Sequence, residues 1–156
     1  MEGCKSTDTP MQARANLSEE NDGYPKVDAH YYRSMIGCLM YLTASRPDIV
    51  QAMNFLSRFL HCANEEHLQA AKRVLRYIKG TVNYGVKYIG GQRLHFSGFA
   101  DSDWAGVVDD MKSTSGFCFS FGSGVFNWCS KKQDIVAQST AEAELVAATE
   151  AANHAI

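Results

Sequence analysis

Hydrophobic residues recur at helical spacing in the first half of the chain. Over residues 31–42 they return every three or four positions, which predicts an amphipathic helix. Pro47 and Asp48 then favour the first turn of a second helix, because proline needs no amide donor there and a carboxylate suits the positive helix end. We expect this helix to extend to about residue 61. Residues 1–30 show little periodicity and predict an irregular arm that needs another element for order.

A third helix is predicted with defined ends. Asn64 is a favourable N-cap, and Gly80 stands where a C-terminal cap is expected. Between them, over residues 65–79, apolar side chains form one stripe. Four basic side chains lie largely off this stripe: Lys72, Arg73, Arg76 and Lys79. They fit either a solvated helix face or a surface that contacts phosphates.

The periodicity changes from helical to alternating after residue 80. Strands are predicted over residues 84–88, 94–100, 117–121, 125–128 and 135–137. The pair around Gly122-Ser123-Gly124 predicts a β-hairpin. Residues 140–155 are rich in Ala and Glu and predict a final helix that Ser139 or Thr140 caps. The fold class expected is therefore α+β, with a mainly helical region over residues 1–90 and antiparallel strands followed by a helix over residues 91–156.

Charge and cysteine content narrow the function classes. The net charge is -2 over 156 residues, which excludes a generally basic nucleic-acid binder. Residues 1–90 carry 11 Lys and Arg against 9 Asp and Glu, whereas residues 91–156 carry 4 against 8. The five cysteines and five histidines form no ligand spacing and predict no zinc site. Without a signal peptide or an apolar run of about 18 residues, we expect a soluble intracellular protein that spans no membrane, in cytoplasm or nucleus.

Acidic residues supply the candidate chemistry of the second half. Asp101 and Asp103 follow an extended run, and Glu142 and Glu144 open the last helix. Carboxylates at the end of a strand are suited to hold a hard divalent cation. By spacing alone this is a weak signal, because acidic residues in loops and first helical turns are usually solvated caps, and only one of the two glutamates can face the strands.

Several segments resemble copia-type retrotransposon Pol polyproteins in order and spacing. They are residues 4–11, 32–49 (YRSMIGCLMYLTASRPDI), 56–59 (LSRF), 71–81 (AKRVLRYIKGT), 101–106 (DSDWAG), 109–116 (DDMKSTSG), 128–133 (WCSKKQ) and 139–144 (STAEAE). Met111, where arginine is common, and Leu145, where tyrosine is common, are small departures. The resemblance covers nearly the whole chain.

The resemblance implies a reverse transcriptase tail over residues 1–90 and the first half of a ribonuclease H-like fold over residues 91–156. Such a domain hydrolyses the RNA strand of RNA–DNA hybrids with two Mg²⁺ ions held by four carboxylates. Asp101 matches the first carboxylate and Glu144 the second, as catalytic and metal-binding residues. Asp103 and Glu142 are then neighbours, although Asp103 could take the place of Asp101. The other two carboxylates would follow residue 156, and the polymerase aspartates would precede residue 1.

Three functional interpretations remain open at this point. The chain is an enzyme fragment that is inactive alone, a non-catalytic nucleic-acid-binding relic that uses the basic helix over residues 65–79, or a folded fragment without a function unless the remainder of the polyprotein completes it. The partner expected in the intact polyprotein is nucleic acid, above all an RNA–DNA hybrid. The incomplete carboxylate set favours the first and third interpretations over the second.

Overall fold

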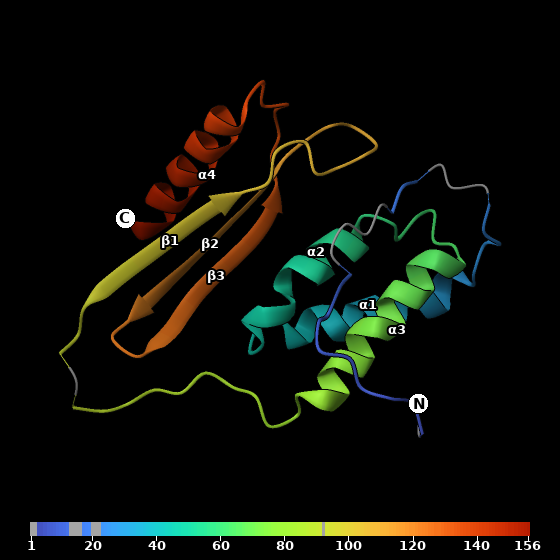
Figure 1. Ribbon diagram of the computed structural model, residues 1–156, viewed down its shortest axis with the longest axis horizontal. Coiled ribbons are helices and arrows are strands. Elements are labelled where there is room, and N and C mark those ends of the chain that lie inside the picture. The colour runs from blue at the N-terminus through green and yellow to red at the C-terminus, as the bar shows by residue number, and fades with distance from the viewer. Residues whose placement is uncertain (1–2, 13–16, 20–22, 92) are drawn as a thin grey trace. The chain divides into compact units, whose positions relative to one another are not determined.

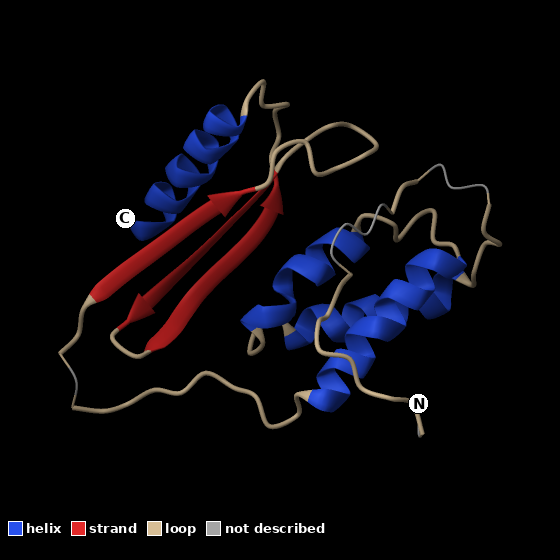
Figure 2. Ribbon diagram, viewed as in Figure 1, coloured by secondary structure: helices blue, strands red, loops and turns tan. Residues whose placement is uncertain are grey.

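The computed structural model describes residues 3–12, 17–19, 23–91 and 93–156. It divides into two compact units, Met1–Gly85 (unit 1) and Val86–Ile156 (unit 2) (Figures 1 and 2). Unit 1 is helical, and unit 2 contains a three-stranded antiparallel sheet and one helix. The α+β class is therefore confirmed. The sequence placed the boundary after residue 90, and the contacts place it after Gly85.

The helices of unit 1 follow the predicted order. They are α1 (Ala29–Leu42), the 3₁₀ helix η1 (Pro47–Ile49), α2 (Val50–Ser57) and α3 (Glu65–Gly80). Pro47 opens η1, so the first turn is 3₁₀ rather than α-helical. The prediction that the second helix reaches residue 61 is wrong, because α2 ends at Ser57 and turns lead from there to Cys62.

The ends of α3 show where the cap prediction held and where it failed. The Asn64 side chain accepts from the His67 backbone amide at 3.1 Å, and the His67 ring accepts from the Asn64 backbone amide at 3.2 Å. This pairing confirms Asn64 as the N-cap. Gly80 is the last helical residue instead, and Thr81 is the C-cap. A Cβ at position 80 would lie 2.8 Å from Cβ of Ser6, so packing explains the glycine.

One apolar core holds the helices of unit 1 together. Its largest fully buried side chains are Tyr32, Ile36, Ile49, Met53, Leu56, Phe59 and Val74. The hydroxyl of Tyr32 donates to the Leu56 carbonyl at 3.0 Å, which satisfies a polar group in the core. The Phe59 ring stacks on His67 with centroids 4.0 Å apart. The three helices therefore share a single interior.

An ion pair between the buried Arg46 and the exposed Asp48 connects the helix ends. Arg46, 7% exposed, precedes η1, and its guanidinium donates twice to the Asp48 carboxylate, at 2.9 and 2.7 Å. It also donates to the carbonyl and hydroxyl of Thr81, at 3.1 and 2.7 Å. Tyr77 donates its hydroxyl to Asp48 at 2.7 Å. The start of η1 is thus bound to the last turn of α3.

The irregular N-terminal arm lies on α3. Arg73 donates to the hydroxyl of Thr9 at 2.8 Å, and Lys79 donates to the Cys4 carbonyl at 3.0 Å. Further along, the Glu65 amide donates to the Pro25 carbonyl at 3.0 Å. The described residues of this arm are irregular up to α1, as predicted, and the element that orders them belongs to the same unit.

Unit 2 is a meander of strands with one helix on it. The strands β1 (Phe96–Ser102), β2 (Thr114–Phe121) and β3 (Gly124–Lys132) lie in the order β1-β2-β3, and α4 (Thr140–Ala155) packs on β1 and β2 (Figure 1). The predicted hairpin is confirmed, with Gly122 at φ 58° in its turn. That left-handed conformation favours glycine. Ser139 caps α4 as predicted.

Two predicted strands do not form. Residues 84–88 are irregular, and the Tyr88 hydroxyl donates to the Val125 carbonyl at 2.6 Å instead of joining a ladder. Residues 135–137 are also irregular, with Ile135 and Val136 about half exposed. The alternation of apolar residues suggested strands, but neither segment buries a face on which a strand depends.

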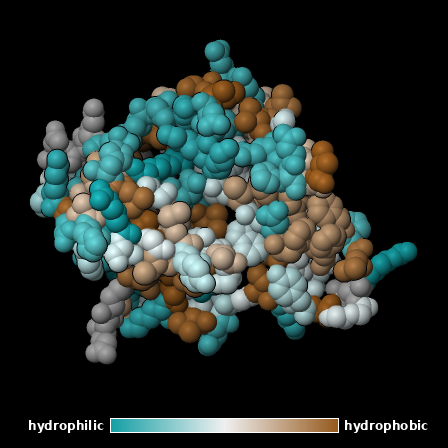
Figure 3. Space-filling model, turned by 180° about the vertical axis from the view of Figure 1, so that it is seen from behind, coloured by the Kyte–Doolittle hydropathy of each residue, from teal (hydrophilic) through white to brown (hydrophobic). Residues whose placement is uncertain are grey.

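The hydrophobic interior of unit 2 is small. Phe117, Phe119 and Ala151 form its buried cluster, and Cys129 packs against them. Phe96, Phe121 and Phe126 form an aromatic cluster on the same sheet but are each more than 40% exposed. Hydrophobic side chains also reach the surface at several separate places (Figure 3). In the part of the chain that the structure describes, no helix is long and apolar enough to cross a membrane.

The Arg46 guanidinium holds the pKa of Asp48 below its ordinary value, chiefly through their hydrogen bonds. A depressed carboxyl pKa adds stability that is present above about pH 4 and is lost as the pH falls through the folded-state pKa. Because Asp48 is exposed and solvent screens the pair, Asp48→Asn should cost unit 1 about 1 kcal/mol at neutral pH, with a smaller acid dependence than the parent chain. Urea unfolding, followed by circular dichroism across this pH range, measures both effects.

The control is Asp8→Asn, which alters an exposed carboxylate in the same unit. Both tryptophans, Trp104 and Trp128, belong to unit 2, so their fluorescence reports that unit separately. An Asp48→Asn chain as stable as the Asp8→Asn chain at neutral pH would show that the ion pair contributes nothing net.

Candidate functional site

Asp101 lies near the end of β1 and is exposed. Its neighbour Ser102 faces α4, since its hydroxyl accepts from the buried Gln133 side chain at 3.4 Å. Successive side chains of a strand point to opposite faces of the sheet. Asp101 therefore points to the face that α4 does not cover, the same face as the 70% exposed ring of Phe99.

Glu144 is exposed in the first half of α4. The buried stripe of this helix is Ala143, Ala147 and Ala151. Glu150, on one flank of the stripe, pairs with Lys131 of β3 at 3.3 Å. Glu144 stands about 120° away around the helix axis, on the other flank. It therefore lies on the side of α4 that borders β1.

These two carboxylates border one open edge. β1 is an edge strand, and among the described residues no strand pairs with its outer side. Asp101 and Glu144 approach that edge from opposite faces of the sheet. Within the described ranges, one group of three metal-ligating side chains lies close enough together to hold one ion. It is Glu19, His61 and Cys62 in unit 1, and it does not include Asp101 or Glu144. The two carboxylates at the β1 edge are hard oxygen ligands, which Mg²⁺ prefers. Two carboxylates supply only part of the coordination shell of Mg²⁺.

The neighbouring acidic residues bond to backbone instead. The Asp103 carboxylate accepts from the Thr114 amide across the β1–β2 loop. The Glu142 carboxylate accepts from the Gln138 amide at 2.7 Å, just ahead of the N-cap of α4. Both side chains therefore fix local backbone, as caps do.

Gln133 joins the strands to α4. Its side chain is 4% exposed, and its amide nitrogen lies 2.9 Å from the Ser115 hydroxyl and 2.9 Å from the Ala143 carbonyl. The backbone amide of Gln133 donates to the Ser113 carbonyl at 2.8 Å. Gln133 thereby sets the first turns of α4 against the ends of β1 and β2. The sequence assigned it no role, although it closes the WCSKKQ motif.

Other motif residues meet at the same end of the sheet. Lys132 donates to Asp110 at 2.8 Å, and the Trp104 ring donates to the Ala137 carbonyl at 3.1 Å. Burial acts to raise the pKa of Asp110, but hydrogen bonds from Lys132 and from the Lys112 amide hold that pKa below its usual value. The motifs DSDWAG, DDMKSTSG, WCSKKQ and STAEAE, distant in sequence, therefore converge where Asp101 and Glu144 lie.

The four basic residues of α3 differ in their surroundings. Arg73 and Lys79 bond to the N-terminal arm, as above, and Lys72 lies 3.8 Å from Glu65. Arg76 is half-buried. Lys72, Arg73 and Arg76 line one side of a groove of about 850 Å³, with Tyr24 and Tyr31 among its other walls. The arm thus converts a basic helix face into a groove with aromatic walls.

Truncation of Gln133 tests the junction at the sheet end. Gln133→Ala leaves the buried Ser115 hydroxyl and the Ala143 carbonyl without this donor, so unit 2 should lose about 1–3 kcal/mol. Tryptophan fluorescence in urea measures the loss. Gln138→Ala, at an exposed site five positions later, should change stability by less than about 0.5 kcal/mol. Equal effects of the two substitutions would contradict the assigned role.

The chain is similar to several curated proteins. It is 44% identical to the Retrovirus-related Pol polyprotein from transposon RE1 of Arabidopsis thaliana, over 90% of this chain and 10% of that protein. It is 40% identical to the Retrovirus-related Pol polyprotein from transposon TNT 1-94 of Nicotiana tabacum, over 96% of this chain and 12% of that protein. The chain thus spans about a tenth of the length of these polyproteins.

A third relative is of similar size to the chain. It is the Secreted RxLR effector protein 161 of Plasmopara viticola, 41% identical over 80% of this chain and 89% of that protein. No family model matches the chain, and no solved structure matches it.

Proposed function

Because the chain belongs to the family of copia-type retrotransposon Pol polyproteins, we propose that it joins the end of a reverse transcriptase to the start of a ribonuclease H domain. On this proposal residues 1–90 are the polymerase tail, and residues 91–156 open an RNase H-like fold. The whole polyprotein would act on RNA–DNA hybrids. This segment would supply part of the nuclease site.

The convergence of four motifs at one end of the unit 2 sheet carries the proposal. Residues from distant parts of the sequence contact one another there, and Asp101 and Glu144 lie exposed beside them at the edge of β1. An unpaired strand edge invites a further strand. A strand added beside β1 would stand next to both carboxylates and could bring a third.

Asp101 and Glu144 are the residues that would hold metal. Bound Mg²⁺ would activate water and stabilise the leaving oxygen of the RNA strand. Asp101 offers a carboxylate from the strand and Glu144 from the helix, while Gln133 fixes the helix against the strand. Two carboxylates on different sides of an edge give Mg²⁺ only part of the octahedral shell it demands. We therefore expect the 156-residue chain to lack useful nuclease activity alone.

A labelled RNA–DNA hybrid in Mg²⁺ tests this function. The chain alone should not cut the RNA strand. The chain joined to the residues that follow the matched segment in the RE1 polyprotein should cut it. In that joined protein, Asp101→Asn or Glu144→Gln should reduce the rate on the order of 100-fold or more, because each removes a metal ligand.

Asp134→Asn is the matched control, since it alters an exposed carboxylate outside the four motifs. Cleavage by the chain alone that Asp101→Asn abolishes would overturn the expected inactivity. Cleavage by the joined protein that survives both substitutions would overturn the assigned site.

The groove beside α3 favours a second candidate function, non-catalytic nucleic-acid binding. Lys72, Arg73 and Arg76 supply positive charge, and Tyr24 and Tyr31 supply aromatic surface on which bases can stack. This function would need no metal and no carboxylate. It does not account for the motif residues that meet in unit 2, so it stays the alternative.

The salt dependence of nucleic-acid affinity tests whether the groove is the binding surface. If the groove binds an RNA–DNA hybrid, affinity should fall steeply with salt, and Arg76→Ala should reduce the slope of log affinity against log salt by about 1. Lys87→Ala, which removes an exposed charge outside unit 1, should leave the slope unchanged. Fluorescence anisotropy at several salt concentrations measures the slope. Equal slopes for the parent chain and Arg76→Ala would exclude this groove as the binding surface.

A further inference from the structure

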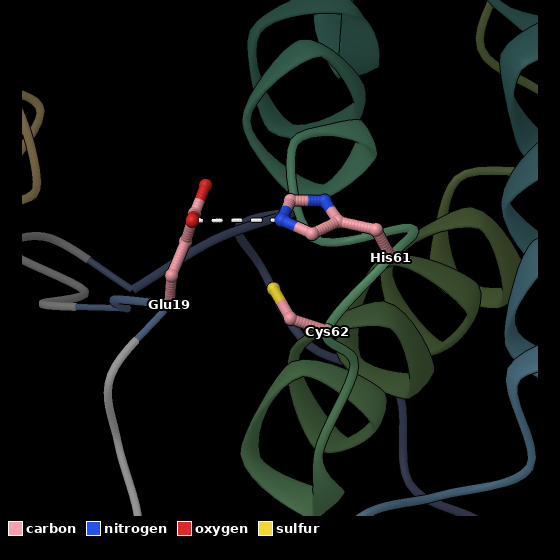
Figure 4. Close-up of side chains that lie close together, drawn as sticks. All are labelled: Glu19, His61 and Cys62. Atoms are coloured by element: carbon pink, nitrogen blue, oxygen red, sulfur yellow. Dashed lines mark ion pairs between the residues drawn. The ribbon is translucent and has the colours of Figure 1, made fainter.

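Three side chains with different donor atoms meet in unit 1, away from the β1 edge. Glu19 comes from the N-terminal region, and His61 and Cys62 come from the turn between α2 and α3 (Figure 4). Their oxygen, nitrogen and sulfur ligand atoms all lie within 4.8 Å of one another. Glu19 Oε2 is 3.5 Å from His61 Nε2. Figure 4 shows the Glu19 carboxylate facing the His61 ring, with the Cys62 sulfur beside them.

We propose that Glu19, His61 and Cys62 bind one zinc ion. A thiolate, an imidazole and a carboxylate are the three ligand types that Zn²⁺ takes, whereas Mg²⁺ and Ca²⁺ require oxygen. In a tetrahedral zinc site the ligand atoms stand about 3.3–3.8 Å apart. The Glu19–His61 separation already has this value. The sulfur reaches it with a shift of about 1 Å, within the range of a side-chain rotation.

The backbone holds two of the ligands in position. The Cys62 amide donates to the Phe59 carbonyl at 3.2 Å, which closes the turn after α2. Arg33 of α1 donates to the Leu60 carbonyl at 3.1 Å, on the other side of His61. The Val27 amide donates to the Ala63 carbonyl at 3.3 Å. Because these bonds fix the turn, His61 and Cys62 lose little freedom when they bind metal.

Exposure determines the kind of site. The Cys62 side chain is partly buried, whereas the side chains of His61 and Glu19 are 63% and 47% exposed. Three protein ligands leave a fourth position of the tetrahedron open to water. Binding would release the thiol proton of Cys62 to solvent, so affinity should rise with pH. The bound ion would connect Glu19 to the turn between α2 and α3.

This site is separate from the proposed nuclease function. It lies in unit 1, uses sulfur and nitrogen, and selects a borderline-soft ion, whereas Asp101 and Glu144 lie in unit 2 and suit a hard ion. Either proposal can therefore fail without the other.

Titration of the purified full chain with Co²⁺, a spectroscopic substitute for Zn²⁺, tests the proposal. Co²⁺ should give a thiolate-to-metal charge-transfer band at one equivalent, and Zn²⁺ should displace it while excess Mg²⁺ should not. Cys62→Ser should abolish the band. His61→Asn and Glu19→Gln should each weaken Co²⁺ binding about tenfold or more, as even loss of an outer-shell partner costs about that much.

Cys38→Ser and His30→Asn are the matched controls, because both residues belong to α1 and lie outside the cluster. Circular dichroism checks that each variant remains folded. Glu19→Gln changes an exposed side chain, so it keeps the test valid even if Cys62→Ser unfolds the unit. A band that Cys38→Ser removes, or an affinity that Glu19→Gln leaves unchanged, would overturn the three-ligand site.

Discussion

The contact between the Arg46 guanidinium and the Asp48 carboxylate is the constraint on which the helical unit depends. Arg46 is the N-cap of η1, Asp48 lies in η1, and Thr81 caps α3, so one charged group ties the start of η1 to the end of α3. A buried guanidinium is costly unless its donors are satisfied, and here four hydrogen bonds satisfy it. These bonds hold the start of η1 against the end of α3.

In unit 2 a neutral polar side chain, that of Gln133, connects separate elements by hydrogen bonds. The interior of unit 2 consists of few buried rings and small residues, which leaves little apolar area to specify one arrangement. Gln133 compensates because its amide contacts a strand hydroxyl and a helix carbonyl together. In both units a segment of the family motifs supplies the connection, SRPD in the first and WCSKKQ in the second.

The proposed nuclease site and the proposed zinc site differ in what they need. Asp101 and Glu144 stand at an open strand edge, and a neighbouring strand would have to complete their coordination. Glu19, His61 and Cys62 already lie together within one unit. As proposed, the first site would need a further strand to complete it, whereas the second would need only contacts between the N-terminal region and the helices.

The sequence by itself determined the elements whose signals are local. Asn64 and Ser139 cap helices because a short polar side chain reaches the nearby amides, and Gly122 allows the hairpin turn by its own conformational freedom. The family motifs likewise singled out Asp101 and Glu144 as candidate site residues. The tertiary structure alone decided which alternating segments became strands, because residues 84–88 look like a strand until burial is known. It also decided that Arg46 and Gln133 connect elements and that Glu19 meets Cys62, since contacts between distant residues depend on packing that no local spacing encodes.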